Sequence, residues 1–362
     1  MAIQVNGKEL NKNYFNIFSK NLISWHKKNG RHDLPWQINI NPYKIWISEI
    51  MLQQTQVQTV IPFYNKFIEK YKNIEDLSNA KLDDILELWS GLGYYRRAAN
   101  IYKSSQILKN QYSCIFPKKY NDILSLPGVG RSTAGAILSL AFNEKYPILD
   151  GNVKRIIKRY FALRGLNNSE NNLWKISELL LPSRKNNIYS QSIMDLGFLV
   201  CIKKKPLCNI CPVKLCCRSN KLKLTDLIPE KIHKKNKKNI IKLFFLVIQN
   251  NKNKNLVLMK KNSQKSIWSN LWNFPNFSKK KEYTEFINEN NFSKKVFLYC
   301  KIKSKLTHLT YDIDVLKVHS KKEINIDHYY WKNIYDKIGS PRPVIIIIKK
   351  LLEEINNANN NV

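Results

Sequence analysis

The chain has 362 residues and carries 61 lysines and arginines against 27 aspartates and glutamates, a formal net charge of +34. This length allows two domains with hydrophobic cores, and the positive charge indicates a polyanionic partner, with nucleic acid as the first candidate. The alternative is compositional drift, because lysine and asparagine also crowd loop-like stretches such as NNKNKN. No signal peptide or membrane segment is recognisable, so we expect a cytoplasmic protein whose seven cysteines are reduced.

Apolar residues recur at helical spacing through the first 226 residues, in the segments 64–71, 82–89, 132–142, 152–163 and 173–181. The polar, mostly basic run KIHKKNKKN follows, and it indicates a linker over 227–239. Beyond it the pattern is typical of strands, at 240–249, 255–260, 295–303 and 311–318, and a closing amphipathic helix spans 344–355. The expected fold is therefore mainly α: a helical domain (1–226), the linker, a smaller α+β domain (240–355) and a disordered tail (356–362).

Glu49 lies in the stretch YKIWISEIMLQQTQV. If this stretch is a helix, Ile45, Trp46, Leu52 and Gln53 share the face of Glu49. Apolar neighbours raise the pKa of a carboxyl group, which then stays protonated near neutral pH, as a general acid requires. The alternative is a glutamate at the edge of an amphipathic helix, with its carboxylate in water.

A glycine turn between two helical runs occurs in SLPGVGRSTAGAI, residues 125–137. A glycine turn that leads into a helix often binds phosphate, because unpaired N–H groups and the helix dipole point at the anion. Only Val129 separates Gly128 from Gly130, so the turn is not the nucleotide-binding P-loop.

Asp150 ends the aliphatic run of YPILDGNVKRIIKRY, just before a basic amphipathic segment. This position is typical of a helix N-cap, whose hydrogen bonds hold a carboxylate ionised. An ionised Asp150 complements a protonated Glu49, and two carboxyl groups in opposite states are the machinery of glycosidic cleavage.

A cysteine cluster with the spacing C-x6-C-x2-C-x5-C closes the helical region, at Cys201, Cys208, Cys211 and Cys217. Four thiolates suit zinc or a [4Fe–4S] cluster. The spacing favours iron–sulfur because it contains a single C-x2-C pair, whereas zinc sites usually have two. Cys216 is an alternative to Cys217 as ligand, and the two remaining cysteines, at 114 and 300, are interpreted as apolar packing residues.

These motifs together resemble the helix-hairpin-helix DNA glycosylases that carry an iron–sulfur cluster. LPWQ, SEIMLQQTQV and LWSGLGYYRRA narrow the resemblance to the adenine DNA glycosylases, the MutY family, over about residues 29–217. The resemblance implies a monomeric enzyme that flips adenine out of duplex DNA, opposite 8-oxoguanine or guanine, and hydrolyses its glycosidic bond. It also implies a [4Fe–4S] cofactor in the 201–217 loop, with Cys217 rather than Cys216 as a ligand.

The resemblance assigns Glu49 as the acid that protonates the departing adenine. Asp150 faces the sugar cation, with Asn152 close by. The remaining implied contacts are Gln54 and Tyr94 inside the duplex, and Trp36 and Asp195 near the flipped adenine.

A wedge must fill the gap that a flipped base leaves in the stack. The turn GLGYY puts Leu92 and Tyr94 between glycines, where both side chains can reach between bases. The alternative is that both are core residues packed under a turn.

The glycine hairpin then has a ligand, a DNA backbone phosphate held by the N–H groups around Gly128 and Gly130. Ser132, which we also expect to contact the DNA, follows in this hairpin, where related bifunctional glycosylases have a lysine that forms a Schiff base. Because serine has no amine, we expect base removal without efficient strand cleavage. Lys154 offers adventitious imine chemistry, but a phosphate contact suits it better.

The C-terminal domain resembles a Nudix-type fold through SIWSNLWNFPNF and LTHLTYDIDV, and in the family it helps to recognise 8-oxoguanine. No glutamate-rich Nudix helix is present, so pyrophosphatase activity is not expected. Leu306, Thr307 and His308 stand where the family commonly has Phe-Ser-His, so a hydroxyl and the histidine are kept while the aromatic residue is absent. A lone histidine in a β domain is otherwise most often structural.

Three rival functions remain at this point. A bifunctional glycosylase/lyase for oxidised pyrimidines conflicts with Ser132 and Glu49. A DNA-binding iron–sulfur protein without catalysis conflicts with the pair Glu49 and Asp150. A zinc-binding nucleic-acid module would lack the visible absorption of an iron–sulfur cluster.

Overall fold

The computed structural model describes residues 3–5, 8–10, 12–230, 239–263, 266–306 and 309–360. The chain forms two compact units, residues 1–78 with 103–233 and residues 79–102 with 234–362. The segment 79–102 therefore packs with the C-terminal residues, although the sequence places it inside a helical domain. Within the described ranges, no helix has the length and hydrophobicity needed to cross a membrane.

The first unit is helical, as the apolar spacing predicted. Its helices are α1 Lys12–Asn29, α2 Pro42–Leu52, α3 Val57–Lys70, α4 Ile74–Ser78, α7 Tyr120–Leu124, α8 Arg131–Phe142, α9 Gly151–Phe161, α10 Glu170–Leu179, α11 Asn186–Asp195 and α12 Arg218–Lys221. Helix α6, Arg96–Tyr112, runs from the second unit into the first. Short helical turns lie at Pro35–Gln37, Gly165–Asn168, Cys208–Ile210 and Lys214–Cys216, a π-helical turn spans Leu196–Val200, and strands β1 Ile3–Val5 and β2 Lys8–Leu10 form a small hairpin.

Helix α9 shows why the sequence folds in this way. Val153, Ile156, Ile157 and Tyr160 recur at intervals of three and four residues and are all buried in the core of the first unit. The basic residues between them are partly exposed at positions 154, 155 and 158, whereas Arg159 is buried. Asp150 caps the helix, so the start of α9 and the orientation of its apolar face are fixed together.

The second unit contains the predicted strands and the closing helix. Its elements are α5 Leu82–Leu88, β3 Asn239–Asn250, β4 Leu256–Lys261, β5 Trp272–Asn273, β6 Asn276–Phe277, α13 Lys280–Glu289, β7 Phe297–Lys305, β8 Leu309–Ser320, β9 Tyr329–Asn333 and α14 Arg342–Asn360. The sheet order is β5-β4-β3-β8-β7, with β6 paired to β3 and β9 paired to β4. Strands β3 and β8 are parallel and in register from Asn239↔Leu309 to Asn250↔Ser320.

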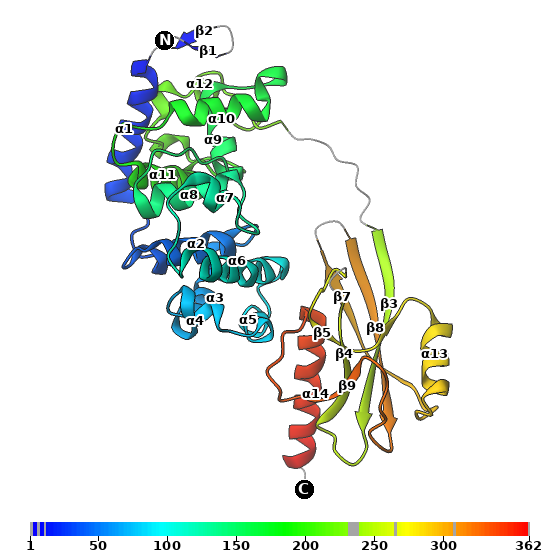
Figure 1. Ribbon diagram of the computed structural model, residues 1–362. Helices are drawn as coiled ribbons and strands as arrows, with labels where there is room; N and C mark the ends of the chain where they lie inside the picture. Colours follow the sequence, from blue (N-terminus) through cyan, green and yellow to red (C-terminus); the bar gives the residue numbers. More distant parts are fainter. Residues whose placement is uncertain are drawn as a thin grey trace. The chain divides into compact units, whose positions relative to one another are not determined.

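Alternate residues of β3 face opposite sides of this sheet. Phe245 and Val247 pack in a core with α14, whereas Leu246 and Ile248 pack in a second core with α13. Figure 1 shows the two helices on opposite faces of the sheet. The predicted α+β character of this region is therefore confirmed.

The C-terminal end of this unit differs from the expected disordered tail. Helix α14 continues to Asn360, so residues 356–360 are helical rather than disordered. The end of α14 carries asparagine and alanine after the amphipathic run, and the helix extends through them. Of the expected linker 227–239, residues 231–238 lie outside the described residues.

Candidate active site

A cavity of about 550 Å³ opens in the first unit between α2, α8 and the start of α9. It is lined by Arg31 and by five of the predicted site residues, Glu49, Gln54, Ser132, Asp150 and Asn152. Residues separated by about a hundred positions thus meet at one site. The structure therefore brings together both predicted carboxylates, the predicted partner Asn152 and the hairpin serine.

Glu49 lies in the regular helix α2 and is surrounded by apolar side chains. Asn41 caps α2 by accepting a hydrogen bond from the Lys44 N–H at 2.8 Å, which fixes the start of the helix. On the face of Glu49, Ile45 and Trp46 are fully buried. Burial, and secondarily the charge of Asp150, raises the pKa of Glu49 from 4.5 to about 7.

Asp150 is the N-cap of α9, as predicted. Its Oδ1 accepts a hydrogen bond from the Val153 N–H at 2.8 Å. Burial raises the pKa of Asp150, although the N–H groups of Val153 and Asn152 and the positive charges of Arg155 and Lys154 act in the opposite direction. The expected downward effect of the cap is therefore outweighed by desolvation, and the pKa of both cavity carboxyl groups is raised.

Asn152 is oriented by Arg155, one turn further along α9. The Nη2 of Arg155 donates to Asn152 Oδ1 at 2.9 Å and to the Gly197 carbonyl at 2.7 Å, while its Nε donates to the Cys201 carbonyl at 2.8 Å. Gly197 also lies so close to Asn152 that an added Cβ would be 2.7 Å from the Asn152 Cβ. These contacts connect the floor of the cavity to the first predicted ligand of the cysteine loop.

The glycine hairpin joins α7 to α8 as the sequence predicted. Gly128 has a φ of +83°, which the turn requires and which favours glycine. Ser132 Oγ accepts a hydrogen bond from the Leu149 N–H at 2.9 Å, and Gln53 Nε2 donates to the Gly128 carbonyl at 3.2 Å. The hairpin is thus tied to the end of α2 and to the segment that leads into Asp150.

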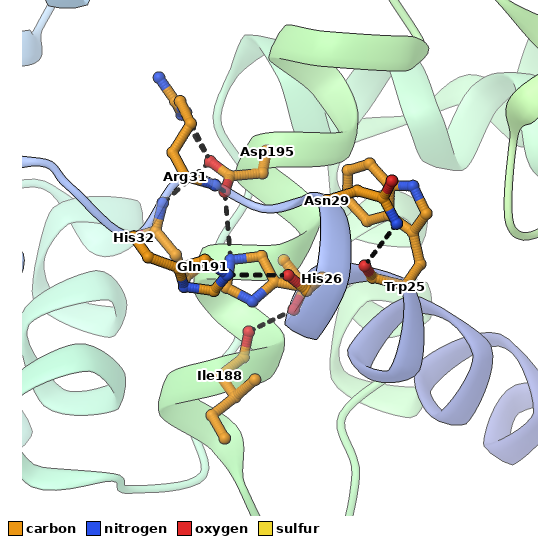
Figure 2. A network of polar contacts seen from close by, with 9 residues as sticks. Trp25, His26, Asn29, Arg31, His32, Ile188, Gln191 and Asp195 are labelled. Atoms are coloured by element: carbon orange, nitrogen blue, oxygen red, sulfur yellow. Dashed lines mark hydrogen bonds and ion pairs between the residues drawn. The ribbon is translucent and has the colours of Figure 1, made fainter.

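Asp195 lies outside the cavity lining and is fully buried at the centre of a polar network (Figure 2). Its carboxylate accepts from His26 Nε2 at 3.1 Å, from Gln191 Nε2 at 3.0 Å and from Arg31 N, Nε and Nη2 at 2.8, 2.9 and 2.6 Å. Desolvation is the largest influence on Asp195, yet the hydrogen bonds of His26 and the charge of Arg31 outweigh it and lower its pKa. Asp195 therefore acts on the cavity through Arg31, which lines it.

Trp36, the other residue expected near the flipped base, is also buried. It packs edge-on against Tyr64, with ring centroids 5.3 Å apart, and it does not line the cavity described above. No sequence pattern pointed to Arg31 or His26 as part of the site. The signal for Arg31 is its place in GRHDLPWQ, beside the LPWQ motif, but its partner Asp195 is 164 residues away.

The residues expected to enter the duplex differ in exposure. Gln54 is exposed and lines the cavity, with a φ of +58°. In the second unit Tyr94 is 46% exposed with a φ of +51°, whereas Leu92 is only 6% exposed. Leu92 therefore fits the alternative, a core residue under the turn, because its side chain packs inward while that of Tyr94 points outward. Thr307 and His308 lie outside the described residues.

The four predicted cysteine ligands line one cavity, next to α9. Cys201, Cys208, Cys211 and Cys217 contribute to this lining and Cys216 does not. Burial raises the pKa of Cys211 to about 12 and that of Cys217 to about 11. Across the described ranges, no three Cys, His, Asp or Glu side chains are gathered closely enough to form a metal site as they stand.

Arg159 is the positive charge beside these thiols. It is 2% exposed, and its guanidinium donates to Cys201 Sγ at 3.5 Å and to the carbonyls of Ile202, Lys203 and Ile228 at 2.6, 3.1 and 2.7 Å. A buried cation with these partners fixes both ends of the cysteine loop against α9. It also compensates negative charge on thiolates at this position.

Comparison with known proteins identifies the class. The family model of the HhH-GPD superfamily of base excision DNA repair proteins matches residues 47–180, which contain Glu49, the hairpin and Asp150. The chain is also similar to the solved structure of a thermostable thymine-DNA glycosylase, with 29% identity and a TM-score of 0.54, covering 58% of this chain and 98% of the other. The fold and the cavity thus belong to a helix-hairpin-helix DNA glycosylase of base excision repair.

Two curated relatives identify the family within this class. The adenine DNA glycosylase of Buchnera aphidicola subsp. Baizongia pistaciae (strain Bp) is 45% identical over 346 residues, which cover 92% of this chain and 97% of the relative. That of Buchnera aphidicola subsp. Acyrthosiphon pisum (strain APS) is 43% identical over 356 residues, covering 94% and 99%. The chain belongs to the adenine DNA glycosylase family, and it is a DNA N-glycosylase.

Proposed function

We propose that this adenine DNA glycosylase removes adenine paired with 8-oxoguanine or guanine and leaves the DNA strand uncut. The observation that carries the chemistry is the pair Glu49 and Asp150 on one cavity, with a pKa of about 7 for Glu49. At neutral pH a large share of Glu49 is protonated and available as an acid. A cavity of about 550 Å³ is also large enough for a flipped nucleotide.

In the proposed reaction, Glu49 gives its proton to a ring nitrogen of the flipped adenine. The C1′–N9 bond then breaks, and its electron pair leaves with the base. Asp150 faces the resulting sugar cation, while Asn152, held by Arg155, lines the same wall. Water adds to C1′, or displaces Asp150 if a covalent bond has formed, and its proton returns to Glu49.

The absence of strand cleavage rests on the lack of an available amine. Ser132 occupies the hairpin position at which a lysine would form a Schiff base. Lys154 is engaged elsewhere, since its Nζ is 2.8 Å from Glu170 Oε1. We infer that the product is an abasic site in an intact strand.

DNA binding is assigned to the hairpin and to two exposed residues. The hairpin N–H groups around Gly128 and Gly130 hold a backbone phosphate, and Gln54 and Tyr94 enter the duplex from backbone positions that project their side chains. The C-terminal α+β region, which we interpret as Nudix-like, reads 8-oxoguanine through Thr307 and His308. The protein acts as a monomer in the cytoplasm on nucleoid DNA.

A [4Fe–4S] cluster suits the cysteine loop by its donor chemistry. Four thiols line one cavity, and the buried cation Arg159 lies beside Cys201. Cys201, Cys208, Cys211 and Cys217 would hold the cluster, which when bound supplies folding free energy by cross-linking the loop. Absorption of visible light by the purified protein separates this cofactor from colourless zinc.

Single-turnover adenine release from a duplex with one A·8-oxoguanine pair tests the proposed function. Matched duplexes carry A·G and A·T at the same position, and strand breaks are scored with and without alkali. We expect release from the two mispairs, with breaks only after alkali. Breaks without alkali would show that the enzyme is also a lyase. Equal release of adenine from the A·T duplex would show that it has no specificity for the mispairs.

A further inference from the structure

The peptide group between Ile148 and Leu149 is hydrogen-bonded at both ends by serine side chains. Ser132 Oγ, on α8, accepts from the Leu149 N–H at 2.9 Å, and Ser177 Oγ, on α10, donates to the Ile148 carbonyl at 2.8 Å. This N–H and this carbonyl belong to one planar group. Two serines on different helices therefore fix the orientation of a single peptide plane, one residue before Asp150.

This plane needs side-chain partners because the chain around it has no regular structure. Helix α8 ends at Phe142 and α9 begins at Gly151, and residues 143–150 belong to neither helix nor strand. Ile148 and Leu149 are both only 3% exposed, so their backbone polar groups need partners inside the protein. The serine hydroxyls supply these partners where a helix or sheet would supply backbone groups.

We propose that Ser132 and Ser177 are positioning residues that aim the Asp150 carboxylate at the sugar. Leu149 is bonded directly to Asp150, so the orientation of the clamped peptide determines where the Asp150 backbone begins. Asp150 Oδ1 then caps α9 by accepting a hydrogen bond from the Val153 N–H. The carboxylate is thus defined from two sides, by the serine clamp before it and by the helix after it. This inference rests on the catalytic role of Asp150 proposed above.

The proposal gives Ser132 a role that differs from a DNA contact. Removing one serine hydroxyl takes away a single hydrogen bond, so its effect on folding stability is modest. Misplacing a reacting group by about 1 Å costs about 100-fold in rate. A clamp that aims Asp150 therefore has a larger effect on the chemical step than on stability or on duplex binding.

The test compares single-turnover adenine release and duplex affinity in four variants, Ser132→Ala, Ser177→Ala, the double variant and Ser132→Thr. We expect each alanine variant to release adenine about tenfold more slowly or worse, with duplex affinity within about twofold of the wild type. The double variant should be at most about threefold slower than the slower single variant, because both serines act on one peptide plane. Threonine at 132 keeps the hydroxyl and should restore most of the rate.

Ser139→Ala is the matched control on the same helix. Ser139 is also a buried serine of α8, and its Oγ bonds to the Asn186 carbonyl at 2.9 Å and to Ser190 Oγ at 2.7 Å, away from the clamped peptide. It should lose stability as Ser177→Ala does, yet release adenine at the wild-type rate. A comparable loss of rate in Ser139→Ala would show that general destabilisation, and not the clamp, slows adenine release, and it would overturn the proposal.

Asp150→Asn separates failure of this inference from failure of the proposed function. If Asp150→Asn is inactive while both alanine variants release adenine at the wild-type rate, the clamp is wrong and the role of Asp150 stands. If Asp150→Asn keeps its activity, the role of Asp150 itself is wrong. Weakened duplex binding with normal release from the bound duplex would make Ser132 a DNA contact and overturn the clamp. If Ser177→Ala does not fold, the pair Ser132→Ala and Ser132→Thr decides the outcome.

Discussion

Glu49 and Asp150 line the same cavity but are held there by different means. Glu49 sits in a regular helix with a capped N-terminus, and burial among apolar side chains raises its pKa to about 7. Asp150 ends a segment without regular structure, and individual hydrogen bonds determine its position. Packing thus controls the proton of the acid, whereas polar contacts control the place of the carboxylate.

The largest effect is expected from Glu49→Gln, which keeps the shape of the side chain and removes its proton. General acid catalysis contributes about 10²–10⁴-fold, so we expect single-turnover adenine release to fall about 10³-fold. Duplex affinity, measured separately, should stay near the wild-type value because the packing around α2 is unchanged. A rate of release within tenfold of the wild-type rate would show that Glu49 is not the acid.

The same substitution should act in the opposite direction on stability. Because the pKa of Glu49 is raised from 4.5 to about 7, its contribution to folding is present in full below pH 4.5 and is lost as the pH rises through about 7. At pH 8 the ionised, partly buried carboxylate therefore destabilises the wild type, by up to about 3 kcal/mol. Denaturant unfolding should show Glu49→Gln more stable at pH 8 and little different at pH 4.5, and equal stability at both would contradict the burial of Glu49.

The pH dependence of the reaction follows from the same proton. Adenine release at saturating enzyme should fall as the pH rises above about 7, by about tenfold per unit, because the protonated fraction of Glu49 falls. Between pH 7 and 9 the protonated fraction of Glu49 falls from about one half to about one hundredth, so the loss is about 50-fold. A rate that is constant to pH 9 would show that another group supplies the proton.

Gly135→Ala tests the segment on the Asp150 side. A Cβ at Gly135 would lie 2.3 Å from the Pro147 carbonyl oxygen, so the backbone three residues before Asp150 must move. Overpacking of this kind costs about 1–3 kcal/mol, and adenine release should slow as well. Gly151→Ala is the stability control, since a Cβ there meets nothing within 4 Å. An unchanged rate in a folded Gly135→Ala protein would mean that Asp150 does not depend on this segment.

The smallest effect is expected from Glu170→Gln. Glu170 pairs with Lys154 at 2.8 Å on the surface beside α9, and its side chain is 64% exposed. Exposed pairs of this kind contribute less than about 1 kcal/mol. The midpoint of unfolding and the rate of release should both stay near wild type. A clear loss of rate would show that Asp150 responds to any polar change nearby, not only to those on its own peptide.

The sequence predicted the surroundings of Glu49 better than those of Asp150. Helical spacing was enough to place apolar residues around Glu49, because those residues are three or four positions away. The N-cap at Asp150 was also predicted, since capping is local. The rise in the pKa of Asp150 was not predicted, because desolvation depends on helices that are distant in the sequence.

Long-range polar contacts explain the other differences. The bonds of Ser132 to Leu149 and of Arg31 to Asp195 join residues 17 and 164 positions apart, and no spacing rule connects such pairs. Leu92 and Tyr94 lie two residues apart in one glycine turn, yet the first is buried and the second exposed. The dihedral angles of the turn decide this, and composition alone does not contain them.

Gln54 and Tyr94 have one further consequence for protein engineering. Both hold left-handed backbone angles, with φ of +58° and +51°, at a cost of about 1 kcal/mol each relative to glycine. A screen that rewards heat resistance alone would therefore favour glycine or asparagine at these two positions. Such a screen would select against the two side chains that we propose to enter the DNA duplex. The thermostable variants that it yields would therefore be less active in DNA repair.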